Sequence, residues 1–317
     1  MSIDNTPGTG AADPSDGQAS GPGDPAADSP ASGSGDPADS PFRHERTARD
    51  EAPQFVLPLV VRIEKAAPPT RTDALEAAAR AVLLMLADER STGGGGEGGD
   101  EGEWARAMRD WQDARIRKVV RRARGGEWRK ASGLPGITVT SPAAPAPASA
   151  PTPTPGEVAA SPRPAAPTPG AENLGTYETP AFAPYAEVRV FPPVPLDGWP
   201  KELAKLQVSG TELDDPAPPP AADPATPVLW LNPDLGMSAG KAMAQAGHGA
   251  QLAWYRLSEQ DREAWCETGF TLAVRTADPA RWRELTSGGL PLVRDAGFTE
   301  IAPGSSTVVA DHPALRR

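Results

Sequence analysis

The chain has 317 residues, of which 39 are Pro and 32 are Gly, and only 5% are aromatic. Much of such a chain lacks the apolar surface needed to offset the entropy of ordering, so the composition excludes a fold that uses the full length. The formal net charge is −11, but the acidity is concentrated near the N-terminus, and the total charge therefore says little about any one binding surface.

Cysteine content and hydropathy narrow the class of protein. The single cysteine, Cys266, excludes an intramolecular disulfide and fits a reducing compartment. The first residues lack the basic start and apolar core of a signal peptide, and no run of about 18 apolar residues occurs. We therefore expect a cytoplasmic protein without a membrane segment. His44 and His312 are isolated in the sequence, so we expect neither a metal site nor a cofactor.

The N-terminal part alternates between low-complexity and periodic segments. Residues 1–52 have almost no large apolar side chains and are predicted to be a disordered acidic tail. Patterns of apolar residues then predict a strand at 54–64, a helix at 71–90 capped by Thr72 or Asp73, a partly helical and strongly basic stretch at 104–131, and a strand at 136–140. Residues 141–184 form a Pro/Ala-rich insert.

The remainder of the chain is predicted to be a small mixed sheet with helices. A strand at 185–193 and a short helix at 196–208 precede an acidic Pro-rich linker at 211–226. The last segments are strands at 227–232, 270–276, 290–295 and 305–311, with helices at 238–260, capped by Ser238, and at 279–288. This order predicts an α/β fold with a four-stranded mixed sheet covered by helices.

The sequence also suggests an internal repeat. Residues 111–130 and 265–284 align without gaps, and each contains two tryptophans at the same spacing before a Gly-Leu-Pro. We infer two copies of the fold, a degenerate one at 53–210, interrupted by the insert at 141–184, and a second at 227–317. Chance similarity between two amphipathic stretches is the alternative.

One face of the helix predicted at 238–260 carries three polar side chains, Lys241, Gln245 and His248, at spacings of four and three. Lys241 lies in the first turn, where free N–H groups and the helix dipole favour an anion. By itself this pattern is also typical of a solvated lysine and a partly buried histidine.

The stretch RDAGFTEIAPGSSTVV (294–309) is equally ambiguous alone. Pro303-Gly304 is typical of a type II turn, and Asp295 could merely cap the turn at Gly297. The hydroxyl residues that follow could simply be strand positions.

Together, DLGMSAGKAMAQAGH (234–248) and DAGFTEIAPGSST (295–307) resemble the two signatures of the archaeal and eukaryotic, or type II, peptidyl-tRNA hydrolases. The resemblance covers about residues 227–310. It implies that family's four-stranded mixed sheet and hydrolysis of the ester between a peptide and the 3′ ribose of tRNA. The family usually has an Arg where this chain has Asn232, and its closing Gly-Ile-Gly-Pro and helix have no match here.

The resemblance assigns roles to particular residues. Asp295 would orient or deprotonate the attacking water, Lys241 would counter the oxyanion or terminal phosphate, and Thr299 and Thr307 would bind water or ribose. Support or substrate binding would come from Gln245, His248, Ser305 and Gly240. A non-catalytic RNA-binding or scaffolding protein on the same fold is the rival, and hydrolysis of another acyl ester is a weaker option.

The first copy, read in the same way, lacks the site. Arg71 falls opposite Lys241, but Leu75 replaces Gln245 and Ala78 replaces His248. Because type II enzymes are expected to be homodimers, such a tandem chain could be a monomeric pseudo-dimer. Residues 104–130 contain ten basic and three acidic side chains, which suits the backbone of tRNA or a solvated helix face. The candidate contacts are Arg115, Arg117, Lys118, Arg121, Arg122 and Arg124.

Overall fold

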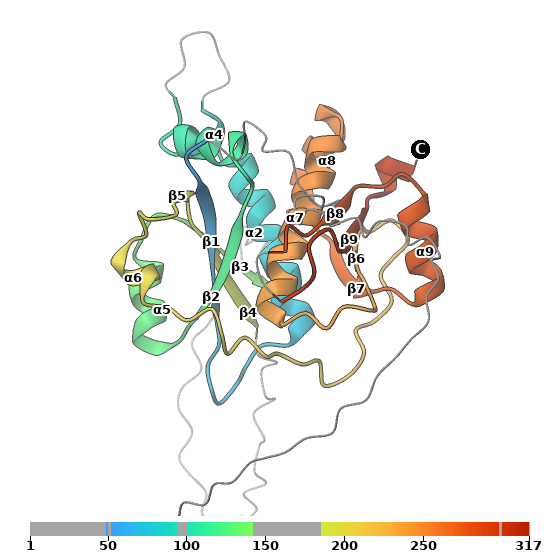
Figure 1. Cartoon of the computed structure of the whole chain (residues 1–317), viewed down its shortest axis with the longest axis horizontal. Coiled ribbons are helices and arrows are strands. Elements are labelled where there is room, and N and C mark those ends of the chain that lie inside the picture. The colour runs from blue at the N-terminus through green and yellow to red at the C-terminus, as the bar shows by residue number, and fades with distance from the viewer. Residues whose placement is uncertain (1–48, 50–51, 94–100, 142–184, 298–299, 317) are drawn as a thin grey trace, which may run out of the picture. The chain divides into compact units, whose positions relative to one another are not determined.

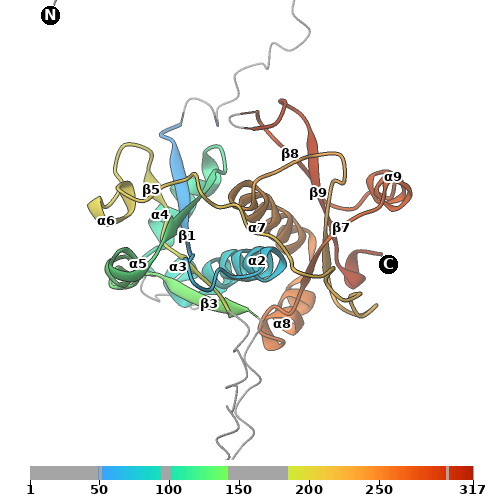
Figure 2. The ribbon, with the colours of Figure 1, turned by 90° about the horizontal axis from the view of Figure 1, so that it is seen from below.

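Two mixed β-sheets face each other across a layer formed by two long helices (Figures 1 and 2). The computed structural model describes residues 49, 52–93, 101–141, 185–297 and 300–316, all within one compact unit of residues 46–317. The tail predicted at 1–52 and the insert predicted at 141–184 lie almost wholly outside these described residues.

The first sheet is built around β1 (Phe55–Arg62), a run of β-branched and other apolar residues that is buried along most of its length. It runs parallel to β2 (Lys118–Ala123) and antiparallel to β4 (Ala186–Val190), which pairs antiparallel with β3 (Ile137–Ser141). The order is β2-β1-β4-β3, and β5 (Val194–Pro195) pairs with the start of β1.

The second sheet has the order β7-β6-β9-β8 with the same strand directions. Here β6 (Val228–Leu231) is parallel to β7 (Ala273–Thr276) and antiparallel to β9 (Ser306–Asp311), which pairs antiparallel with β8 (Leu292–Arg294). The predicted α/β class with small mixed sheets is therefore confirmed. We call residues 52–206 the N-terminal half and residues 226–316 the C-terminal half.

The two central helices are α2 (Arg71–Ala87) and α7 (Ala239–Arg256), and both are rich in alanine. The remaining helices are α3 (Glu89–Thr92), α4 (Ala105–Asp113), α5 (Gly125–Ser132), α6 (Lys201–Ala204), α8 (Glu259–Glu267), α9 (Pro279–Ser287) and the 3₁₀ turn η1 (Pro313–Arg316). Among the described residues, none of the helices combines the length and apolar character needed to cross a bilayer.

Small side chains allow α2 and α7 to approach closely. Ala74, Ala77, Ala78 and Ala81 of α2 are fully buried, and α7 contributes buried glycines and alanines. A Cβ atom placed on Gly247 would stand 2.9 Å from Cγ2 of Val82 in α2. A single apolar core consequently runs from one sheet through both helices to the other sheet.

Equivalent elements of the two halves also agree in detail. Helices α4 and α8 have nine residues each, and a buried tryptophan near each C-terminal end uses its indole N–H in the same way. Trp111 Nε1 donates to the carbonyl of Arg117 at 2.9 Å, and Trp265 Nε1 donates to that of Thr271 at 2.9 Å. Each acceptor lies six residues after its tryptophan, so the similarity extends beyond the strand order.

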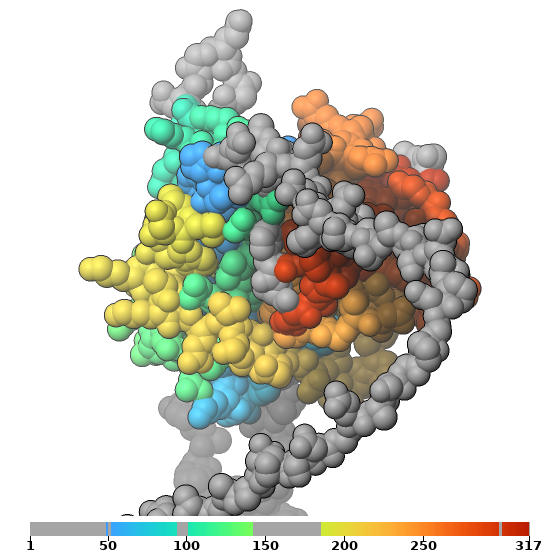
Figure 3. Space-filling model, viewed as in Figure 1, coloured from blue at the N-terminus to red at the C-terminus, as the bar shows by residue number. Residues whose placement is uncertain are grey.

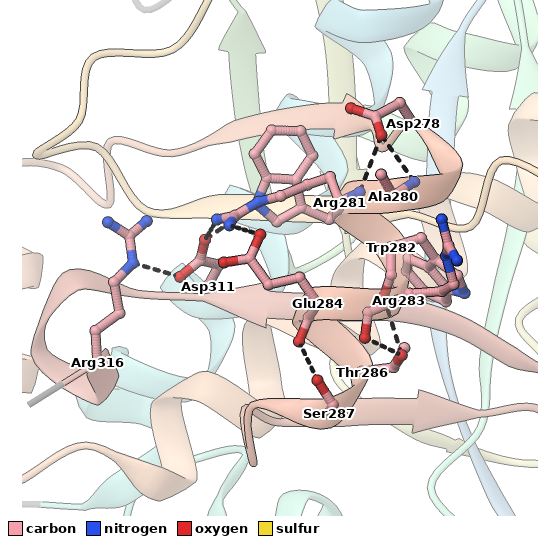
Figure 4. Close-up of polar contacts among 11 residues, drawn as sticks. Asp278, Ala280, Arg281, Trp282, Arg283, Glu284, Thr286, Ser287, Asp311 and Arg316 are labelled. Atoms are coloured by element: carbon pink, nitrogen blue, oxygen red, sulfur yellow. Dashed lines mark hydrogen bonds and ion pairs between the residues drawn. The ribbon is translucent and has the colours of Figure 1, made fainter.

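The outer face of each sheet has a smaller core. Trp128 of α5 packs against one and Trp282 of α9 against the other. On the second sheet, the carboxylate of Asp311 is only 1% exposed and accepts hydrogen bonds from Arg316 Nε at 2.5 Å and Arg281 Nη2 at 3.1 Å (Figure 4). This buried carboxylate anchors α9 and the end of the chain to β9.

Several predicted elements need correction. The stretch at 104–131 contains β2, because Val119 and Val120 continue the sheet beside β1, and is helical only on either side. The helix predicted at 196–208 is reduced to α6, and the one at 238–260 ends at Arg256, before Ser258 caps α8. The predicted cap Ser238 is confirmed, whereas α2 is capped by Thr70 and not by Thr72 or Asp73.

Part of the predicted linker at 211–226 packs against both halves. We call residues 207–215 the strap, which crosses from the N-terminal half toward α7 (Figure 3). It pairs with the free edge of β2, buries Leu213 in the central core, and reaches the N-terminal ends of both central helices. There Thr211 Oγ1 accepts from Gly240 N at 3.1 Å, and Asp215 accepts from Thr72 N at 2.8 Å. The acidic and hydroxyl residues of the strap therefore act as helix caps.

We predict that Gly247→Val lowers the free energy of unfolding by about 1–3 kcal/mol, because the added atoms would separate α2 from α7. Gly236→Ala is the matched control, since a Cβ there meets nothing within 4 Å, and should change stability by less than about 0.5 kcal/mol. Chemical denaturation of both variants measures the difference. Equal stability of the two would show that the helix contact is not tight.

Candidate functional site

The polar face of α7 points toward the loop between β8 and β9. Ser238 caps the helix by accepting from Lys241 N at 3.2 Å, so Lys241 lies in the first turn as predicted. Gln245 follows one turn later and His248 one turn after that. Gln245 is buried, with 4% of its surface exposed, whereas Lys241 and His248 are partly exposed.

Asp295 lies at the end of β8, and its two carboxylate oxygens have different partners. Oδ1 accepts from Gly297 N at 2.8 Å and so caps the turn. Oδ2 accepts from Lys241 Nζ at 2.5 Å and from Gln245 Nε2 at 2.7 Å. The local capping role and the contact with α7 are therefore both present, on separate oxygens of one carboxylate.

Thr307 extends this network into the core. It is 0% exposed on β9, and its hydroxyl donates to Gln245 Oε1 at 2.6 Å. The amide of Gln245 is thereby oriented, because its NH₂ group must face the carboxylate of Asp295 while its oxygen accepts from Thr307. The structure thus places Thr307 behind Gln245, where it orients the amide.

The loop that carries Asp295 is held by its backbone. Asp295 N donates to Ser305 O at 2.9 Å, and Gly304 N donates back to Asp295 O at 2.7 Å. The predicted type II turn is present, since Ser305 N donates to Ala302 O at 3.2 Å and Gly304 has a φ of 79°. Ser305 contributes through its carbonyl. Thr299 lies outside the described residues.

Three neighbours of the site were not predicted from sequence. The hydroxyl of Thr211 in the strap accepts a hydrogen bond from the amide N–H of Gly240, and a Cβ on Gly240 would stand 2.7 Å from Thr211 Oγ1. Glu300 accepts from the Ser238 hydroxyl at 2.6 Å, and Arg71 of the N-terminal half donates to Met237 O at 3.1 Å. The sequence marks Arg71 only as the counterpart of Lys241, and no local motif marks Thr211 or Glu300.

His248 contacts the N-terminal half. Lys118 Nζ lies 3.2 Å from His248 Nδ1 and donates to Gln251 Oε1 at 2.5 Å. Burial, and then the charges of Lys118 and Lys241, hold the pKa of His248 well below its ordinary value of 6.5. The imidazole is therefore neutral at pH 7.

The basic residues proposed for tRNA contact are placed unequally. Lys118 is 8% exposed and faces α7, so its ammonium is not available to a phosphate. Arg121 donates to Leu206 O at 2.6 Å and lies over the Trp199 ring, and Arg122 donates to Ser209 O at 2.9 Å. Arg115, Arg117 and Arg124 are each partly exposed.

Asp295 and Lys241 have hydrogen-bonding capacity left for a water and for a negatively charged oxygen. A carboxylate has roughly four acceptor positions, of which Asp295 uses three, and an ammonium has three donors, of which Lys241 uses one on Asp295. The remaining acceptor can orient a water, and the remaining donors can meet a negatively charged oxygen. In the part of the chain that the structure describes, no three His, Cys, Asp or Glu side chains gather to hold a metal ion.

The C-terminal half of the chain is similar to known proteins. Residues 226–317 match the family model described as Peptidyl-tRNA hydrolase PTH2. The peptidyl-tRNA hydrolase of Pyrobaculum aerophilum is 38% identical over 102 residues, which cover 27% of this chain and 82% of that protein. Those of Thermococcus onnurineus and Methanocaldococcus jannaschii are 37% and 32% identical, over 27% of this chain and 82% and 84% of theirs.

The matched region contains both sequence signatures and the network that joins Lys241, Gln245, Asp295 and Thr307. Through this C-terminal half, the chain belongs to the PTH2 family of peptidyl-tRNA hydrolases.

Proposed function

We propose that this chain hydrolyses the ester bond between a peptide, or an N-blocked amino acid, and tRNA, and so recycles tRNA from peptidyl-tRNA. The observation that carries the proposal is the contact of Asp295 Oδ2 with both Lys241 and Gln245. It places a carboxylate and an ammonium side by side at the start of a helix, where 7% of the Asp295 side chain and 11% of the Lys241 side chain are exposed. Family membership of residues 226–317 supports the same reaction.

Each residue has a role in this reaction. The free acceptor position of Asp295 orients the attacking water, and the carboxylate can take its proton. Water attacks the ester carbonyl carbon, and the ammonium of Lys241 stabilises the oxyanion of the tetrahedral intermediate. The intermediate collapses by breaking the bond to the ribose 3′ oxygen, which takes the proton that Asp295 accepted from water and leaves as a hydroxyl. Gln245, oriented by Thr307, keeps Asp295 in place, and Thr299 remains a proposed ligand of water or ribose.

We further propose that the N-terminal half is a degenerate copy of the same domain. The common strand order, the matched tryptophan hydrogen bonds and the shared core support this. The parallel strands pair at equivalent positions in the two sheets, with Leu59 beside Val120 in one and Leu229 beside Val274 in the other. In this alignment of the two halves, Arg71 corresponds to Lys241. The N-terminal half then has Leu75 and Ala78 in place of Gln245 and His248, and the chain is a pseudo-dimer in one polypeptide.

The edge of β2 and the loop before it are the proposed contact for the tRNA backbone. Arg115, Arg117 and Arg124 are the candidates because their side chains are partly exposed. Lys118 is buried against α7, and Arg121 and Arg122 donate to backbone carbonyls. Contacts of this kind depend on charge and not on base sequence, so binding through them would weaken steeply with salt.

We predict that Asp295→Asn and Lys241→Met each lower kcat/KM for N-acetyl-aminoacyl-tRNA by about a hundredfold or more, because one loses the carboxylate and the other the ammonium. Release of N-acetyl-amino acid measures the rate. Asp197→Asn and Lys201→Met, which change the same residue types at exposed positions near α6, are the matched controls and should retain wild-type rates.

Binding of tRNA, measured beside the rates, separates chemistry from recognition. The proposal expects the two site variants to bind tRNA within a few-fold of wild type. A wild-type rate equal to the uncatalysed background, with tRNA binding intact, would overturn the hydrolase and favour the RNA-binding alternative.

For the repeat, we predict that the full chain is monomeric in solution, because α2 already covers the face of α7 that a second copy would otherwise pack against. Size-exclusion chromatography with light scattering measures the mass, and one chain has 33.0 kDa. A stable species of twice that mass would count against an internal pseudo-dimer.

A further inference from the structure

A lysine from the N-terminal half is buried against the helix that carries the site. Lys118 extends from β2, is 8% exposed, and packs its stem 3.3 Å from where a Cβ of Gly247 would be. Its ammonium donates to Gln251 Oε1 at 2.5 Å, lies 3.2 Å from His248 Nδ1, and stands 5.0 Å from the Trp111 ring centroid. Within the described residues, no carboxylate forms an ion pair with it.

Burial of an ammonium without a counter-ion is costly, and burial lowers the pKa of Lys118 well below 10.5. The fold itself does not require a charge here. In the strand pairing common to both sheets, the counterpart of Lys118 is Leu272, which is also buried. The counterpart of His248 is Ala78. The lysine and histidine that meet between the two halves thus correspond to a leucine and an alanine, both of which are buried in the central core.

The contact determines where the proton of His248 lies. In its charged form Lys118 has only donors, and Gln251 presents its oxygen to it, so the protonated lysine donates to Nδ1 of His248. A neutral imidazole that accepts at Nδ1 carries its hydrogen on Nε2. His248 is partly exposed on the same face of α7 as Lys241 and Gln245, and its Nε2–H can donate to an oxygen acceptor.

We propose that Lys118 is a positioning residue of the hydrolase site: it fixes His248 as the Nε2–H tautomer, which donates to an oxygen at the 3′ end of the tRNA substrate. The N-terminal half, although it lacks the site itself, thereby completes the site of the C-terminal half. The step from tautomer to substrate rests on the proposed function, whereas the tautomer itself does not.

The test is ¹⁵N NMR of the histidine side chains in the full chain. Lys118→Met keeps the stem and removes the donor, and we expect the His248 signals to change from a single Nε2–H form to a mixture of both tautomers. Val120→Ala, which creates a cavity on the same strand and face, is the control and should leave the tautomer unchanged. His312, whose Nδ1 accepts from Ala314 N at 3.2 Å, is an internal reference.

The activity assay on the same variants tests the second step. Loss of one oriented hydrogen bond predicts a fall in kcat/KM of about tenfold for Lys118→Met and little change for Val120→Ala. A tautomer change without a rate change would overturn the role in the reaction. If Lys118→Met changes the tautomer but the wild-type chain hydrolyses no substrate, the action of Lys118 on His248 stands and the proposed function fails.

An Nδ1–H form of His248 in the wild-type chain, or an unchanged Nε2–H form in Lys118→Met, would overturn the proposal directly. Should Lys118→Met fail to fold, Lys118→Leu provides the same comparison, since the corresponding strand position accommodates Leu272.

Discussion

The close packing of α2 on α7 is the contact on which the remaining structure depends. It is possible because alanine and glycine line both helices, so that Val82 fits against Gly247 and the two sheets share one core. The same small residues that make these helices weakly amphipathic let them form a central layer between two sheets. Larger side chains at these positions would leave two small domains, each with an exposed apolar helix face.

This packing also determines where the site can be assembled. The groups proposed to react come from α7 and from the loop between β8 and β9, but part of their surroundings comes from the strap and from the N-terminal half. The strap supplies Thr211 to the first turn of α7, and β2 supplies Lys118 to His248. The strap and the N-terminal half thus contribute polar groups around one end and the middle of α7, although the carboxylate proposed to react, Asp295, follows β8 of the C-terminal half.

Sequence reasoning predicted the parts of the site that local chemistry determines. The cap at Ser238, the helical spacing of Lys241 and Gln245, and the turn at Pro303-Gly304 depend on neighbouring residues, and all are present. The cap on α2, the strand inside 104–131 and the packed strap were missed or wrongly assigned, because each depends on segments distant in the chain. The burial of Lys118 is the clearest case, since its partners lie more than 100 residues away and a basic stretch is normally solvated.

Native-state hydrogen exchange of α2 and α7 tests most directly whether the two halves form one unit. If a shared core holds them, the central amides of both helices should exchange only through the same global opening, with equal free energies and equal dependence on denaturant. Exchange of the α2 amides through a much lower-energy opening, while those of α7 remain protected, would show that the halves fold independently and would contradict this account.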